Sequence, residues 1–177
     1  MKIDLSGFIS SQESVCPLDV SFSPSDGADG TGMLPDFVKI KENGIRLTGE
    51  LRSVGGYVSL TARVAVDYDT FCDRCLAPLS RTFSFDFDRQ VALDPRRVPA
   101  DADDEPLVYE DGKIDLDEPL TEAIALELPT FHLCREDCPG LCPVCGRLRS
   151  DPECKCAEKK EIDPRLAILK KLLDNNS

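Results

Sequence analysis

The sequence predicts an α+β protein: an antiparallel β-meander or partial barrel with one packing helix, a cysteine-rich zinc-ribbon-like module and a short C-terminal helix. Three observations lead to this class. Glycine turns separate alternating apolar segments in the middle third, one amphipathic helical segment follows, and six of the nine cysteines then lie within residues 134–156. We expect a β-rich domain over residues 1–130 and a metal module with the terminal helix over residues 131–177.

The clearest strands flank Gly55-Gly56, which is a two-residue hairpin signal. Pairing across this turn brings only apolar or small residues together on one face, which defines the register well. The expected pairs are Leu51 with Leu60, Gly49 with Ala62, Leu47 with Val64, and Ile45 with Val66. Asn43-Gly44 is a second turn signal, and it would bring Ile40 opposite Leu47 and Val38 opposite Gly49 on the same face.

A fourth strand is expected at residues 81–88, because Phe83, Phe85 and Phe87 alternate there with polar residues. Near the N-terminus, Ile3 and Leu5 alternate in the same way and predict a short strand. Residues 10–35 are rich in Ser, Asp, Gly and Pro, and we expect a long mobile loop. Residues 94–118 contain three prolines and many acids, and we expect a solvated linker.

A helix is expected over residues 117–128, with Asp117 as its cap and Pro129 ending it. Leu120, Ile124 and Leu128 lie on one stripe, which can pack against the sheet. A short C-terminal helix is expected from Asp163-Pro164, with leucines at helical spacing. Its apolar face could cover the metal module or bind a partner, and the sequence does not decide between these.

Cysteine spacing is the strongest chemical signal. Cys142 and Cys145 form a CxxC pair followed by Gly146, which is the form of a zinc knuckle. Two short-spaced pairs, separated by eight residues, predict one four-thiolate zinc site from Cys142, Cys145, Cys154 and Cys156. The upstream pair Cys72 and Cys75 lies at the turn between the third and fourth strands.

The remaining cysteines leave alternatives. Cys72 and Cys75 can join Cys134 and Cys138 in a second zinc site, which leaves only Cys16, in the expected loop, without a partner. A competing partition joins Cys72 and Cys75 with Cys142 and Cys145. In a third interpretation, Cys72 and Cys75 are simply small apolar residues that end two strands.

Charge restricts the classes of partner. The formal net charge is −12, so a large nucleic-acid footprint is disfavoured and a basic protein partner is the better electrostatic match. The alternative is that the negative charge only maintains solubility. A locally less acidic segment, residues 147–171, could still contact RNA. No apolar run is long enough for a membrane span, and no apolar leader follows Met1, so we expect a cytoplasmic protein with reduced thiols.

An enzyme is not expected. The single histidine, His132, is a possible fourth metal ligand, but more simply a structural residue beside the cysteines. The CxxC pairs could cycle between dithiol and disulfide, but redox proteins place one such pair in a βαβ setting, whereas these pairs cluster on antiparallel turns. No pair of carboxylates is marked for acid–base chemistry, so catalytic residues and a small-molecule substrate are not predicted.

The motifs together resemble a known family. They are Cys72-Asp-Arg-Cys75-Leu after paired strands, an acidic linker, a helix ending in Leu-Glu-Leu-Pro, the segment Cys138-Pro-Gly-Leu-Cys142-Pro-Val-Cys145-Gly, and a closing Cys154-Lys-Cys156. This set is similar to the YceD-like proteins, called large ribosomal RNA subunit accumulation proteins. The resemblance covers residues 35–156. It implies a non-enzymatic role in the synthesis, processing or stability of large-subunit rRNA, and a gene that often neighbours one for a basic large-subunit ribosomal protein. Together with the acidic charge, this makes rRNA or a basic large-subunit ribosomal protein the expected partner.

Overall fold

The computed structural model describes residues 1–10, 14–23, 34–94 and 106–156. The chain forms two compact units, Met1–Cys138 and Pro139–Ser177. Residues 131–138, which the sequence analysis groups with the metal module, belong to the first unit, as do the sheet and the described helices. The expected C-terminal helix from Asp163 lies outside the described residues.

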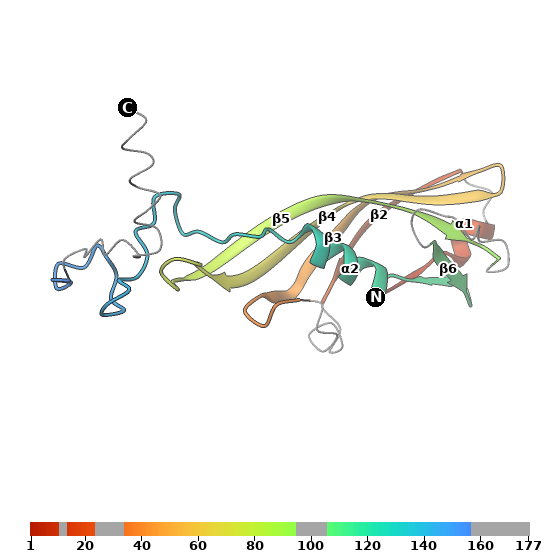
Figure 1. Cartoon of the computed structure of the whole chain (residues 1–177). Helices are drawn as coiled ribbons and strands as arrows, with labels where there is room; N and C mark the ends of the chain where they lie inside the picture. Colours follow the sequence, from red (N-terminus) through yellow and green to blue (C-terminus); the bar gives the residue numbers. More distant parts are fainter. Residues whose placement is uncertain (11–13, 24–33, 95–105, 157–177) are drawn as a thin grey trace, which may run out of the picture. The chain divides into compact units, whose positions relative to one another are not determined.

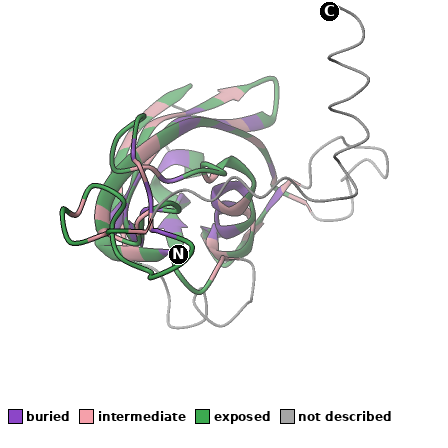
Figure 2. Cartoon of the chain, turned by 60° about the vertical axis from the view of Figure 1, so that its left-hand side comes forward, coloured by how far each residue is buried: buried purple, intermediate pink, exposed green. Residues whose placement is uncertain are grey.

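The first unit is built on one curled sheet (Figures 1 and 2). Within the described ranges the sheet has seven strands, in the spatial order β1-β7-β6-β5-β4-β3-β2. Neighbouring strands are antiparallel except β5 and β6, which pair in parallel. The strands are β1 (Lys2–Asp4), β2 (Val15–Phe22), β3 (Lys39–Val54), β4 (Tyr57–Phe71), β5 (Pro78–Ala92), β6 (Leu107–Glu110) and β7 (Lys113–Asp115).

The central hairpin has the predicted register. Gly55 and Gly56 both have positive φ, 60° and 85°, as a tight turn between right-twisted strands requires. Across it β3 and β4 pair as expected: Leu51 with Leu60, Gly49 with Ala62, Leu47 with Val64, and Ile45 with Val66. The predicted fourth strand is also confirmed as the middle of β5, where Phe85 and Phe87 are buried and Phe83 packs against the core.

The predicted turn at Asn43-Gly44 is wrong. β3 continues through it as one strand, and Ile40 pairs with Tyr68 of β4 instead of Leu47. The register shifts between Ile40 and Ile45, and Asn43 has φ of 51°, so the residues that suggested a hairpin form an irregularity within a long strand. Because β4 is 15 residues long, it offers a partner on both sides of this point, and the extra residues are accommodated as a bulge.

Two segments expected to be irregular contain strands. Within residues 10–35, β2 pairs with β3 along its whole length, so Cys16 lies half-buried in a strand and not in a loop. Within residues 94–118, β6 and β7 form a hairpin whose turn residues, Asp111 and Gly112, both have positive φ. Short length and acidic surroundings concealed this hairpin, although Asp-Gly is a strong turn signal.

In the described part of the chain, two helices cover the inner face of the sheet. Helix α2 (Asp117–Glu127) buries Leu120 and Ile124 against the core, and each such side chain contributes about 1.5–3 kcal/mol. Its N-cap position is Leu116, so the predicted capping by Asp117 is wrong; the side chain of Asp115 instead accepts a hydrogen bond from the amide of Asp117. Helix α1 (Ser6–Ser10) was not predicted. No helix in the described part of the chain is long and apolar enough to cross a membrane.

Candidate metal centres

The turn between β4 and β5 holds the first cysteine pair in a specific backbone conformation. The amide of Cys72 donates to the carbonyl of Ala77 at 2.8 Å, and the amide of Leu76 donates back to the carbonyl of Cys72 at 2.8 Å. This geometry requires a left-handed residue directly after Cys75, and Leu76 has φ of 59°. A leucine in this region is strained, so the surrounding structure must hold the turn closed.

The second pair adopts the same conformation in the second unit. The amide of Cys142 donates to the carbonyl of Arg147 at 2.6 Å, and the amide of Gly146 donates to the carbonyl of Cys142 at 2.8 Å. Gly146, with φ of 71°, takes the position of Leu76 without strain. Two CxxC turns with the same hydrogen bonds therefore present two pairs of sulfurs, each pair on one side of its turn.

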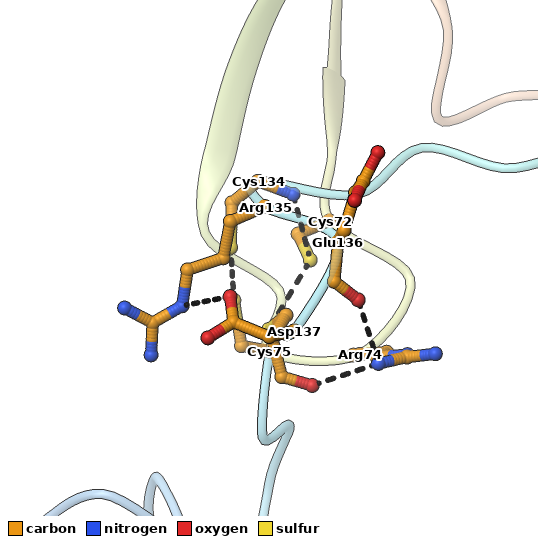
Figure 3. A network of polar contacts seen from close by, with 8 residues as sticks. Cys72, Arg74, Cys75, Cys134, Arg135, Glu136 and Asp137 are labelled. Atoms are coloured by element: carbon orange, nitrogen blue, oxygen red, sulfur yellow. Dashed lines mark hydrogen bonds and ion pairs between the residues drawn. The ribbon is translucent and has the colours of Figure 1, made fainter.

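Segments far apart in the sequence complete the first group of sulfurs. After α2, the chain returns to the β4–β5 turn and brings Cys134 and Cys138 to Cys72 and Cys75. Figure 3 shows Cys134 beside Cys72 and Cys75. The Sγ atoms of Cys72 and Cys138 lie 3.8 Å apart, and those of Cys75 and Cys134 lie 3.7 Å apart. Cys72 and Cys138 are buried. The tetrad therefore joins two segments of the first unit that lie more than fifty residues apart in the sequence.

Polar contacts hold the returning segment on the turn. Asp73 and His132 exchange two hydrogen bonds, because the Asp73 amide donates to the His132 carbonyl at 2.8 Å and the His132 amide donates to a carboxylate oxygen of Asp73 at 2.6 Å. The guanidinium of Arg81 donates to the carbonyl of Leu133 at 2.6 Å, and that of Arg74 donates to the carbonyl of Cys138 at 3.0 Å. The sequence did not identify Asp73, Arg74 and Arg81 as residues that hold this segment. Its one signal for them is that Asp73 and Arg74 lie between Cys72 and Cys75.

The second tetrad is local to the second unit. Cys142, Cys145, Cys154 and Cys156 gather their sulfurs within 4.8 Å of one another, as the first tetrad also does. The Sγ atoms of Cys145 and Cys154 are 3.7 Å apart. Here only Cys142 is buried, and Cys145 is exposed.

The sulfur spacing fits a tetrahedral ion. Four sulfurs at about 2.3 Å from a central zinc form a tetrahedron with edges of about 3.8 Å, and the measured distances of 3.7–3.8 Å match these edges. A disulfide would require about 2.05 Å, and all nine cysteines are free. Each tetrad can therefore hold one soft divalent cation with a complete set of four ligands.

Electrostatics within each tetrad favours a cation. Burial alone would raise the pKa of Cys72, but the backbone amides of Cys134, Arg74 and Cys75 outweigh it and lower the pKa to about 6. Contact with the Cys138 side chain, together with burial, raises the pKa of Cys134 to about 12.

The second tetrad repeats this division. The backbone amides of Cys145 and Val144 lower the pKa of Cys142 to about 6, and contact with Cys145 raises the pKa of Cys156 to about 12. Each tetrad thus has one thiol that ionises readily and at least one that keeps its proton because neighbouring sulfurs repel a further negative charge. A divalent cation removes that repulsion.

The eight predicted ligands form two groups. Cys72 and Cys75 join Cys134 and Cys138, as in the first partition considered from the sequence, and do not join Cys142 and Cys145. Cys16 is not a member of either. His132 is not a member either: its side chain is 4% exposed and lies edge-on to Tyr68, with ring centroids 5.6 Å apart. Both of its ring nitrogens lack a hydrogen-bond partner within the described residues. It packs beside the first tetrad as a structural residue.

Comparisons with known proteins agree with the motifs. A family model described as "Large ribosomal RNA subunit accumulation protein YceD" matches residues 60–173. Uncharacterized proteins of Mycobacterium tuberculosis and Mycobacterium bovis are 38% identical over 146 residues, which is 77% of this chain and 66% of theirs. An uncharacterized protein of Mycobacterium leprae is 29% identical over 58% of this chain and 48% of its own length. No solved structure matches.

Proposed function

Because the chain belongs to the YceD family of large ribosomal RNA subunit accumulation proteins, we propose that it acts in the synthesis, processing or accumulation of large-subunit rRNA. In this proposal it acts in the cytoplasm as a non-enzymatic assembly factor, through a surface stabilised by two zinc ions. The family match over residues 60–173 carries the proposal, since that range includes all eight cysteines of the two tetrads.

The tetrads support binding over catalysis. A zinc ion with four thiolate ligands has no free coordination position for water or substrate, so its contribution is structural. The residues that would hold zinc are Cys72, Cys75, Cys134 and Cys138 in the first unit, and Cys142, Cys145, Cys154 and Cys156 in the second. When bound, zinc would fix the two CxxC turns and present their neighbouring side chains rigidly.

Deletion of the gene tests the proposed function. We expect mature large-subunit rRNA to fall relative to small-subunit rRNA, with a matching deficit of free large subunits in sedimentation profiles. A plasmid copy of the wild-type gene should restore the ratio. A deletion strain with normal rRNA ratios and subunit profiles, also under cold stress, would reject the ribosomal role.

A second candidate is a chaperone, or zinc-binding interaction module, for a basic ribosomal protein. The formal net charge of −12 favours it, because an acidic body attracts basic proteins and repels RNA. Co-purification with one ribosomal protein after nuclease treatment supports this candidate, whereas nuclease-sensitive, salt-sensitive recovery of rRNA supports direct RNA binding. A thiol-redox role is less well supported, since the sulfurs gather in fours at 3.7–3.8 Å and not as isolated reactive pairs.

A further inference from the structure

A groove of about 720 Å³ lies on the first unit, and its described lining residues do not include a cysteine. Helix α2 lines it with Glu118, Glu122 and Leu126, which are spaced by four residues and so share one face. This is not the face that packs on the core, which carries Leu120 and Ile124. The groove is therefore formed by the outer side of α2 together with residues of β6 and β7.

The groove has an exposed apolar strip. Leu126 is 78% exposed, and Val108 on β6 is 38% exposed. Two prolines, Pro106 and Pro119, also line the groove. Several exposed apolar side chains within one concave surface are typical of a site that a partner covers.

The charges around the strip are predominantly negative. Among the residues that the structure describes, five acidic and three basic side chains line the groove. Asp115 is engaged by Lys2 and by the amino group of Met1, which also pairs with Asp117. In contrast, the carboxylates of Glu110, Glu118 and Glu122 make no hydrogen bond or ion pair within the described part of the chain. The groove thus offers three carboxylates that are unpaired within the described residues, beside an apolar strip.

We propose that this groove binds a lysine- or arginine-bearing segment of a protein partner, with an aliphatic side chain of that segment against Leu126 and Val108. Cationic groups of the segment pair with Glu118, Glu122 and Glu110, while their methylene stems cover the apolar strip. Nucleic acid is excluded, because phosphates would meet the unpaired carboxylates. The identification of the partner as a basic ribosomal protein rests on the proposed function. The basic and apolar character of the bound segment rests on the groove alone.

Fluorescence anisotropy with a designed peptide tests the groove. The probe is a short, labelled, helix-forming peptide of leucine and lysine, added to the full zinc-loaded chain at low salt, and its twin carries glutamate in place of lysine. The lysine peptide should bind and the glutamate peptide should not. Glu118→Gln/Glu122→Gln should weaken binding about tenfold, since each rim ion pair contributes up to about fivefold. Leu126→Ala should weaken it about fivefold through lost apolar contact.

The matched control is Glu42→Gln/Glu127→Gln, which removes the same charge from exposed positions outside the groove. It should change affinity by less than about twofold. Equal weakening by the control and the groove variant would show general attraction to an acidic protein and overturn the proposal, as would unchanged affinity in Glu118→Gln/Glu122→Gln. Neither of these binding results bears on the proposed role in rRNA accumulation. Conversely, normal rRNA in the deletion strain would reject that role without changing the interpretation of the peptide binding.

Discussion

Replacing Cys72 and Cys75 together by serine should remove one of two zinc ions per chain and release residues 129–138 from the sheet. The physical reason is that this tetrad joins the β4–β5 turn to a segment whose sulfurs lie 59 and 66 residues away. Structural zinc contributes about 10–16 kcal/mol in small zinc-binding peptides. The remaining contacts of the segment, such as those of Arg74 and Arg81 with backbone carbonyls, contribute only about 1.5–3 kcal/mol each.

The sheet itself should survive this change. Its core residues Leu47, Leu60, Val64 and Phe87 are buried independently of the cysteines. Elemental analysis should therefore show the loss of one zinc, and hydrogen exchange should show increased exchange at the amides of residues 132–138, with far-ultraviolet circular dichroism nearly unchanged. The control Cys16→Ser, in β2, should retain both ions. Full zinc content in the double variant would contradict the first tetrad.

Replacing Cys142 and Cys145 should have a larger local effect, the unfolding of residues 139–156. This segment has no apolar core of its own in its described part: Val144 is 75% exposed, Leu148 is 45% exposed, and one bridge between Leu141 and Leu148 is its only strand pairing. A metal is therefore the main source of its order.

Limited proteolysis measures this second effect. The double variant should lose one zinc and become cleavable within residues 139–156, while thermal unfolding of the first unit stays within a few degrees of the wild type. Val144→Ala, an exposed change inside the same segment, is the matched control and should retain zinc and resistance. Resistance of the double variant equal to that of the wild type would show that contacts other than metal order the segment.

The sequence predicted best where local chemistry determines geometry. Gly55-Gly56 fixes the hairpin because only residues tolerant of positive φ fit its turn, and the apolar alternation then excludes other registers. The grouping of cysteines followed from spacing and from the need for four ligands per ion. The helix at residues 117–127 followed from its apolar stripe.

Prediction failed where a distant partner decides the conformation. Asn43-Gly44 has the same local preference as a hairpin turn, but β4 extends past it and pairs with β3 on both sides, so the turn residues form a bulge within one strand. β2 carries Cys16, Leu18, Val20 and Phe22 at alternate positions, which is a strand pattern. Pro17 and the Ser- and Asp-rich neighbouring sequence weakened that pattern, and the pairing with β3, more than twenty residues away, decides the conformation. Asp73, Arg74 and Arg81 hold the segment of Cys134 through contacts that no local pattern contains.

X-ray absorption spectroscopy of freshly purified, tag-free protein tests the central claim most directly, because it reports the metal, its ligands and their distances together. The two tetrads predict two zinc ions per chain, each surrounded by four sulfurs at about 2.3 Å, with no nitrogen or oxygen in the first coordination sphere. A spectrum that requires a nitrogen ligand, as binding by His132 would produce, or a zinc content near zero in reduced protein, would contradict it.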